Sequence, residues 1–434
     1  MVSVLHVLRN NRNYRYMWMG QVVSEIGDHF NNIAVFSLVL ANVPSGLAVS
    51  GVMLARAVPA VLAGPIAGVL LDRLDRKKVM IASDLIRAVV ALGFILTVDG
   101  NPKTSLWLLY GLSSVLMFAS PFFTSGRSAI LPTVATGEEL HTANSITQTT
   151  GWATLAIGAF AAGAIVSKMG FKPAFLFNAL SFIFSAASIS QLHVAKGSFR
   201  PARKALTEND VVRPWHEYVE GLRYMRSTPL IFAIALIGIG WASGGGAAQI
   251  LFSLFGELVF KRGAEGIGYI WGCAGIGLVI GGALGHWLGR RISFNEYKRS
   301  VIICYLVHGG AYIIFSQMRS FAAALFFIGL SRSAVAVTSV LNFSQLLRHV
   351  PDTYRGRVYS TIESSVWSTM MISMMVAGIA SQYHSPRLIG ACAGALTSTT
   401  AIFWAWANYT GHLPEPKLEG VDPDEVEVHG EQTV

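Results

Sequence analysis

Two carboxylates in one long apolar stretch are the residues that most clearly suggest chemistry. Glu25 and Asp28 are three residues apart, so a helix would place them on one face. An ionised side chain in apolar surroundings is costly and usually marks a transport pathway, a proton site or a permanent ion pair. Because a carboxyl group can take up and release a proton, Asp28 is our first candidate for proton coupling. Glu25 and Glu363 are further candidates, which could instead act in a gate.

Two arginines also lie inside apolar stretches, Arg56 and Arg332. One interpretation of Arg56 is a permanent structural ion pair with Asp28, and the other is contact with a transported solute. Asp28 together with Arg332 would also suit a zwitterionic headgroup.

A dense charge cluster separates two other apolar stretches, where residues 68–78 read GVLLDRLDRKK. Basic residues alone would serve as a topology signal. The added Asp72 and Asp75 favour a polar lock that closes a gate in one conformation and breaks in another. Our gating candidates are Gly68, Asp72, Arg73, Arg76, Lys77, and the pair Asp84 and Arg87, which are one helical turn apart.

The composition indicates which elements must hold these residues. Of the 434 residues, 53% are hydrophobic and only 13% are charged, and the mean hydropathy is +0.50. Soluble domains carry about 25% charged residues, and an apolar run of about 18 residues can cross a bilayer as a helix. The sequence therefore predicts an all-α, polytopic membrane protein with twelve spans, at 14–41, 47–71, 79–98, 105–126, 141–167, 172–194, 229–259, 264–289, 298–317, 320–346, 357–383 and 387–409.

Lys and Arg are concentrated in the loops that share a side with both termini, which predicts that both termini are cytoplasmic. We expect a multi-pass protein of the cell (inner) membrane. Its predicted organisation is an amphipathic inner-face N-terminus at 1–13, a six-helix bundle at 14–194, a cytoplasmic linker at 195–228, a second six-helix bundle at 229–410 and an acidic cytoplasmic tail at 411–434.

The two predicted bundles share a motif. Gly68 and Gly285 lie half a chain length apart, and each follows an apolar helix and opens a short basic loop. The first copy is similar to the signature G-x-L-x-D-R-x-G-R-K of the major facilitator superfamily. With GDHFNNIA at Gly27, ASDLIRA at Ala82 and VPDTYRGRV at Val350, the chain resembles the branch of macrolide and enterobactin exporters. In span five, GAFAAG at 158–163 keeps only the outer glycines of an antiporter signature.

This resemblance implies the major facilitator fold, with two pseudo-symmetric six-helix halves and a cavity bordered by spans one, four, seven and ten. It also implies that Asp72 stabilises the outward-open state. The glycines of SGGGAAQ at 243–249 predict either a bend for gating or a close helix contact. Aromatic and amide side chains suit a large amphiphile, and our substrate-binding candidates are Asn31, Asn32, Arg56, Phe122, Phe123, Trp241, Gln249, Arg332 and Asn342.

The sequence has no phosphate-binding loop, nucleophile motif or metal-ligand spacing, so we expect no enzyme activity, no cofactor and no metal. The leading hypothesis is a monomeric secondary active transporter that exports amphipathic, drug-like or siderophore-like solutes by alternating access, coupled to proton entry. One alternative is a lysophospholipid or lipid translocator of the same fold, and another is a receptor-like membrane protein without transport. The expected partners are the solute, protons and membrane lipids, and no nucleic acid.

Overall fold

The computed structural model describes residues 4–135, 137–193, 199–200 and 214–416. Parts of the predicted linker, at 195–198 and 201–213, and of the predicted tail, at 417–434, lie outside the described residues, as does residue 194 at the end of the first predicted bundle.

The described chain is helical, and twelve of its helices are long. They are α2 (Arg12–Asn42), α3 (Gly46–Arg73), α4 (Arg76–Gly93), α5 (Pro102–Val134), α6 (Gly137–Met169), α7 (Phe171–Ser190), α9 (Pro229–Leu254), α10 (Gly263–Gly289), α11 (Phe294–Gln317), α12 (Phe321–His349), α13 (Asp352–Ala380) and α14 (Pro386–Tyr409). Two helices are shorter, α1 (Val4–Asn10) and α8 (Pro214–Ser227). A 3₁₀ turn, η1 (Phe94–Thr97), continues α4, and a π-helical turn, η3 (Phe255–Val259), continues α9.

Eleven of the described helices are long and apolar enough to cross a membrane. The twelfth, α2, has 31 residues but carries more charge, including Glu25 and Asp28. It packs against α6 and α7, which are among these eleven helices. The prediction of an all-α, polytopic membrane protein is therefore confirmed, with eleven described helices suited to cross a membrane, and α2 as the twelfth span stays a prediction.

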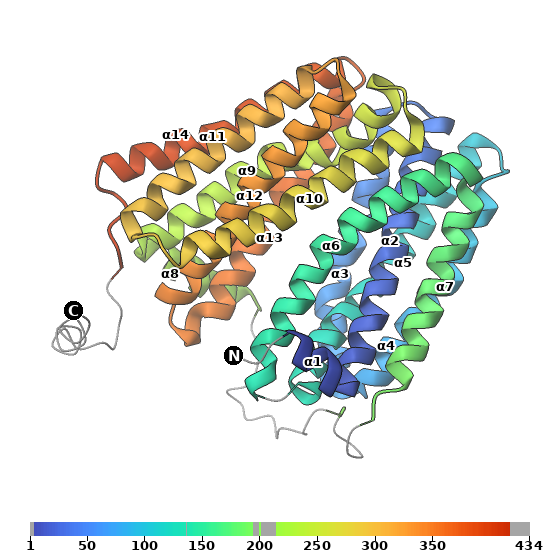
Figure 1. The fold of residues 1–434 in the computed structure, drawn as a ribbon, viewed down its shortest axis with the longest axis horizontal. Coiled ribbons are helices and arrows are strands. Elements are labelled where there is room, and N and C mark those ends of the chain that lie inside the picture. The colour runs from blue at the N-terminus through green and yellow to red at the C-terminus, as the bar shows by residue number, and fades with distance from the viewer. Residues whose placement is uncertain (1–3, 136, 194–198, 201–213, 417–434) are drawn as a thin grey trace.

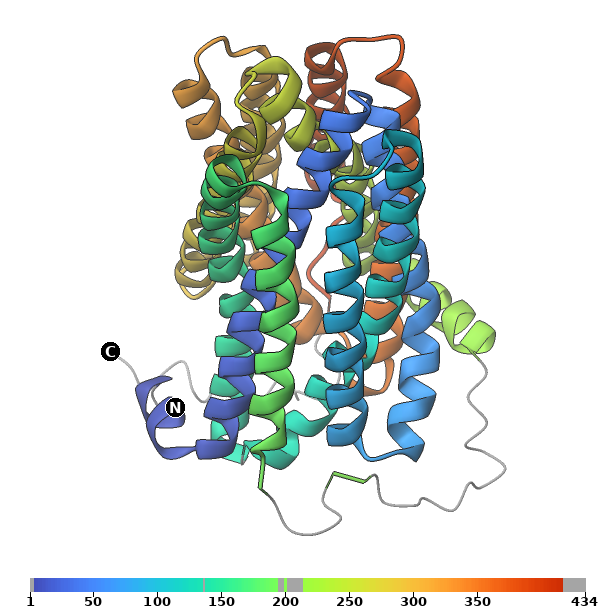
Figure 2. The ribbon, with the colours of Figure 1, turned by 90° about the vertical axis from the view of Figure 1, so that its right-hand side faces the viewer.

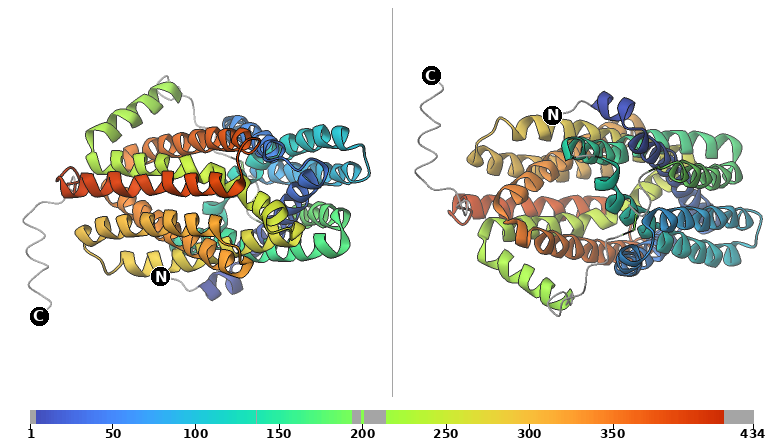
Figure 3. Two further views of the ribbon diagram at one scale, coloured as in Figure 1. Left: turned by 90° about the horizontal axis from the view of Figure 1, so that it is seen from above. Right: turned by 90° about the horizontal axis from the view of Figure 1, so that it is seen from below.

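The helices form two groups, α2–α7 and α9–α14, each packed mainly on itself (Figure 1). Figures 2 and 3 show the same two groups from the side and from both ends of the molecule. The groups touch chiefly along two helix pairs, α6 with α10 and α3 with α13.

Small residues allow α6 and α10 to approach closely. A Cβ atom on Gly268 would lie 2.5 Å from the carbonyl oxygen of Ala159, and one on Gly163 would lie 2.9 Å from the Cα of Gly268. Helices without bulky side chains at the contact gain van der Waals packing, which is the main attraction between helices in lipid. Gly163 of the 158–163 motif is therefore part of the contact between the halves, whereas Gly158 packs on His29 within the first half.

The two ends of the molecule differ in how the halves meet. We call the end with α1 and the α3–α4 connection the N-terminal face, and the other end the opposite face. At the opposite face, Ser50 Oγ donates a hydrogen bond to the Met374 carbonyl oxygen at 2.9 Å, and Gly46 packs against Ser381. Near the N-terminal face, a Cβ on Gly68 would meet no atom within 4 Å. The halves are thus in contact at the opposite face and separated at the N-terminal face (Figure 1).

The structure changes the predicted end of span four and decides between the two interpretations of the glycines in span seven. Span four does not end at residue 126, because α5 continues to Val134 through Pro132 and therefore contains Arg127. In span seven, α9 is unbroken across SGGGAAQ. Gly244 packs on the backbone of α14 and Gly246 on that of α13, so these glycines serve a close helix contact.

Candidate functional site

A cavity of about 500 Å³ lies between the two halves. Its walls come from α2, α3, α5 and α6 on one side and from α9, α10 and α13 on the other. Most of the lining is apolar or aromatic, including Phe36, Trp271, Trp367 and Met374. A large apolar cavity with few polar groups is the usual form of a small-molecule site.

Three of the predicted substrate-binding residues line this cavity: Asn32 on α2, Arg56 on α3 and Gln249 on α9. They come from helices distant in sequence, and the association of the two halves brings them together. The cavity uses spans one, four and seven, as expected. However, no described residue of span ten (α12) lines it, and spans two, five, eight and eleven do. The expected set of lining spans was therefore wrong for this conformation.

The other predicted substrate-binding residues lie elsewhere. Asn31 is buried in the first half, and Asn342 accepts a hydrogen bond from Tyr297 Oη at 2.9 Å. Arg332 faces a separate, very small pocket with His308 and Tyr312. Phe122 packs on Phe118 and Phe123 on Arg87, both within the first half, and Trp241 packs against the hydrophobic core.

Sequence reasoning missed His29, Trp271 and Trp367, which all line the cavity. His29 stands inside the GDHFNNIA motif directly after Asp28, so its position was available as a signal. The two tryptophans lie on spans eight and eleven, which were not expected to border the cavity. Only the packing of the helices reveals which of their faces turn inward.

Asp28 is half-buried on α2, one residue before the cavity residue His29. It interacts electrostatically with Arg87, Arg56, Glu25 and Asp84. Within the described part of the chain, no ion-pair contact joins Asp28 to Arg56. The permanent Asp28–Arg56 pair considered from the sequence is therefore not formed in this conformation, and Asp28 lies among several charges without a fixed partner.

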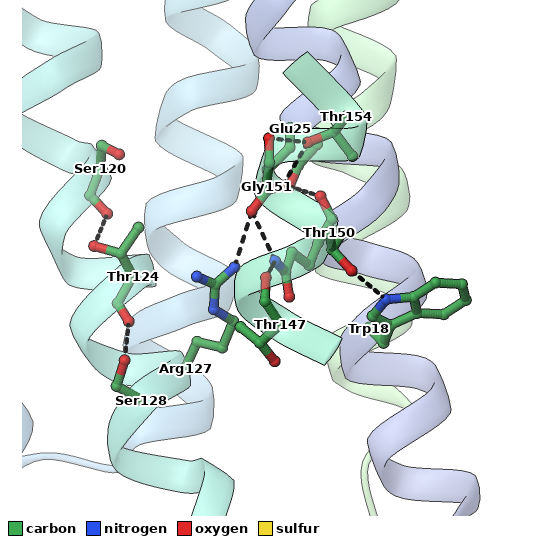
Figure 4. Close-up of polar contacts among 12 residues, drawn as sticks. Trp18, Glu25, Ser120, Thr124, Arg127, Ser128, Thr147, Thr150, Gly151 and Thr154 are labelled. Carbon is green, nitrogen blue, oxygen red and sulfur yellow. Dashed lines mark hydrogen bonds and ion pairs between the residues drawn. The ribbon is translucent and has the colours of Figure 1, made fainter. Parts of the chain in front are cut away.

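Glu25 has fixed partners, as Figure 4 shows. Its carboxylate pairs with Arg127 Nη1 on α5 at 3.3 Å and accepts hydrogen bonds from Thr154 Oγ1 on α6 and Gln21 Nε2 on α2, each at 2.8 Å. Two turns before Glu25 on α2, Trp18 Nε1 donates to Thr150 Oγ1 at 2.8 Å. This network connects α2, α5 and α6 within the first half.

Asp84 and Arg87 form a buried ion pair within α4. The Arg87 guanidinium also lies 4.8 Å from the ring centre of Phe123 and 4.3 Å from that of Phe182. The sequence placed this pair in the same network as the charge cluster at 68–78. The structure instead surrounds it with α5 and α7 side chains, where it holds three helices of the first half together.

The charge cluster makes its contacts inside the first half. Lys77 Nζ donates to the carbonyl oxygens of Ser190 and Leu192, both at 2.8 Å, at the end of α7. Arg76 Nη1 donates to the Ala129 carbonyl oxygen of α5 at 3.0 Å. These bonds fasten the α3–α4 connection to α5 and α7.

The acidic members of this cluster have separate positions. Asp75 caps α4 by accepting a hydrogen bond from the Lys78 amide at 3.2 Å. The Asp72 side chain is 79% exposed, and its one ion pair with a described residue is the one with Arg76, at 4.0 Å. Arg73, the remaining gating candidate of the connection, is exposed. With the halves apart at this face, Asp72 is available for a partner in another conformation.

The last proton-coupling candidate, Glu363, is half-buried on α13 beside Tyr359, one turn away. Among the described residues, no group of three or more His, Cys, Asp or Glu side chains could hold a metal ion. Cys273, Cys304 and Cys392 are free thiols.

Comparison with known proteins adds a family to this geometry. The family model described as Major Facilitator Superfamily matches residues 17–365. BacE of Bacillus subtilis (strain 168), which is proposed to export bacilysin, is 26% identical over 384 residues, covering 87% of this chain and 90% of BacE. Macrolide efflux protein A of Streptococcus pyogenes is 24% identical over 288 residues, covering 66% and 68%.

The fold also matches a solved structure. A bacterial homologue of the iron transporter ferroportin, crystallised in an inward-facing state, superposes with a TM-score of 0.69 at 18% identity, covering 91% of this chain and 98% of that one.

Proposed function

The chain belongs to the Major Facilitator Superfamily, and from this premise we propose that it exports amphipathic small molecules as a secondary active transporter. As a member of this family it is a transporter and not an enzyme. Export is the direction named for its relatives, BacE and macrolide efflux protein A.

The cavity between the halves is the observation that carries the proposal. It is large enough for a drug-sized solute, mostly apolar, and built from both halves. A rocking motion that separated α3 from α13 at the opposite face and joined the halves at the N-terminal face would expose it to the other side. We assign the N-terminal face to the cytoplasm of a bacterial cell, because of its excess of Lys and Arg.

We further propose that proton entry drives export and that Asp28 carries the proton. Asp28 is next to the cavity and has no fixed partner, whereas Glu25 is held by Arg127 and Thr154. The Asp28→Asn variant resembles the protonated form permanently. Solute binding should therefore survive, while uphill transport driven by a pH gradient should be lost.

Proteoliposomes containing the purified protein test both proposals. Export of an amphipathic dye should follow an imposed pH gradient in the wild type and stop in Asp28→Asn, with dye binding retained. Full gradient-driven transport by a folded Asp28→Asn protein would reject Asp28 and direct attention to Glu25 and Glu363. Movement of labelled phospholipid between leaflets, without transport of the dye, would favour the lipid translocator instead.

A further inference from the structure

The permanent charge of the cavity lining is positive. Arg56 is the only residue with a permanent charge among the described residues that line the cavity, and none of these is Asp or Glu. Arg56 is only 9% exposed, and its Nη1 atom is buried without a hydrogen-bond partner in the described chain. A buried cation is costly unless an anion or hydrogen-bond acceptors surround it.

The neighbours of Arg56 compensate its charge incompletely. The guanidinium carbon lies 5.9 Å from the centre of the Phe36 ring, which supplies a weak cation–π attraction. Asp28 interacts with Arg56 electrostatically, but no ion pair forms. The other two arginines buried in the described helices differ, because Arg87 is paired with Asp84 and Arg332 lies outside this cavity.

Another unpartnered donor lies in the same cavity. The indole Nε1 of Trp271, on α10 of the second half, is buried without a hydrogen-bond partner in the described chain. Arg56 and Trp271 therefore present two kinds of N–H donor from opposite halves. Trp367 and Met374 supply apolar surface around them.

We infer that the cargo of this cavity is an anionic amphiphile, with an apolar or aromatic body and one oxyanion such as a carboxylate. The Arg56 guanidinium would bind the oxyanion through charge-assisted hydrogen bonds. Trp271 N–H would donate one more bond, and the body would lie against Trp367 and Met374. A cationic amphiphile would meet repulsion from Arg56 and find no carboxylate in the lining. This inference rests on the proposed transport function and names its class of solute.

Three probes with one ring system and different charges test the inference. The wild-type protein is placed in phosphatidylcholine nanodiscs, and binding of 2-naphthoate, 2-naphthamide and 2-naphthylmethylammonium is measured by equilibrium dialysis. We expect 2-naphthoate to bind at least tenfold more tightly than the other two. Equal affinities, or a preference for the ammonium, would overturn the inference.

Matched variants test whether Arg56 causes the preference for 2-naphthoate. Arg56→Gln should bring the three affinities together, and Arg56→Lys should keep most of the difference because it keeps the charge. Arg332→Gln removes a buried arginine outside the cavity and should leave the preference unchanged. If Arg56→Gln does not fold, Asp28→Asn provides the test: loss of the competing negative charge should tighten 2-naphthoate binding several-fold, and unchanged or weaker binding would count against the inference.

An oxyanion can belong to a soluble solute or to a lipid headgroup. Adding phosphatidylglycerol to the nanodiscs separates these sources. Competition with 2-naphthoate that persists in Arg56→Lys and is lost in Arg56→Gln assigns the site to lipid, and absence of competition in the wild type assigns it to soluble anions. Uphill export of a cationic dye without any preference for 2-naphthoate would leave the transport proposal intact and reject this inference. Selective binding of 2-naphthoate without transport of any probe would instead reject the transport proposal.

Discussion

The buried and half-buried arginines inside the first half differ in how their charge is compensated. Arg87 has a carboxylate and two aromatic rings, and Arg127 has the Glu25 carboxylate. Arg56 has no carboxylate at ion-pair distance within the described chain, and its Nη1 atom is buried without a hydrogen-bond partner there. Compensated charges fit a structural role, whereas an uncompensated charge in a cavity is suited to binding.

The Asp84–Arg87 pair provides a prediction at this scale. Asp84→Asn should destabilise the protein by about 3–5 kcal/mol, because it leaves the Arg87 cation buried without its countercharge. Thermal unfolding of the purified protein measures this loss. The double variant Asp84→Asn with Arg87→Met should regain part of it. An unfolding temperature equal to that of the wild type in Asp84→Asn would show that the pair does not hold α4 in place.

At the scale of the helices, small residues decide where the two halves touch. Gly163 on α6 and Gly268 on α10 allow backbone contact between the halves, and Gly46 on α3 leaves room for the side chains of Ser381 and Leu254. These contacts involve few hydrogen bonds, so their free energy comes mainly from close packing. They can therefore separate and re-form as rigid surfaces during a transport cycle.

One added methyl group tests whether close packing between α6 and α10 holds the halves together. Gly268→Ala should lower the unfolding temperature and slow transport, because its Cβ would lie 2.5 Å from the Ala159 carbonyl oxygen and force α6 and α10 apart. Gly310→Ala on α11 is the matched control, since a Cβ there meets nothing within 4 Å. It should be neutral or stabilising by up to about 1 kcal/mol. Equal unfolding temperatures and equal transport rates in the two variants would mean that the contact between α6 and α10 tolerates separation.

The whole molecule is closed at the opposite face and open at the N-terminal face. At the closed face, Gly46 and Ser381 bring α3 against α13. At the open face, Asp72 is exposed and Gly68 has no close neighbour. An alternating-access cycle requires that the opposite face opens while the N-terminal face closes.

A disulfide at the closed face should prevent that face from opening. A Cβ on Gly46 would lie 2.7 Å from the Cβ of Ser381, so a small outward shift reaches the distance of about 3.8 Å that a disulfide requires. Gly46→Cys with Ser381→Cys, in a protein without Cys273, Cys304 and Cys392, should cross-link under mild oxidation and lose transport. Reduction should restore transport, and each single-cysteine variant should be unaffected by the oxidant. Continued transport by the cross-linked protein would exclude opening between α3 and α13.

The open face provides a complementary test. Asp72 contributes little to the fold in this conformation, because it is exposed and its ion pair with Arg76 is long. Asp72→Asn should therefore keep the unfolding temperature of the wild type, while transport falls strongly if Asp72 closes the gate in the other state. Normal transport by this variant would reduce the charge cluster to a topology signal.

The sequence by itself determined the class of the molecule. Long apolar runs predicted twelve spans, and the signature at 68–78 predicted the family, because both depend on composition and local order along the chain. The same local order predicted the Asp84–Arg87 pair, whose members are one helical turn apart. Asn32, Arg56 and Gln249 could be named as polar residues in apolar spans before their surroundings were known.

Only the tertiary structure decided which side chains share a site. Glu25 and Arg127 are far apart in sequence, and their contact depends on how α2 and α5 are rotated and tilted. The same holds for Trp271 and Trp367, whose inward direction follows from the close packing of α10 and α13 on the first half. A span looks apolar on every side in the sequence, since lipid and protein interior are both apolar. The direction of each face is therefore set by packing between helices, and hydropathy carries no record of it.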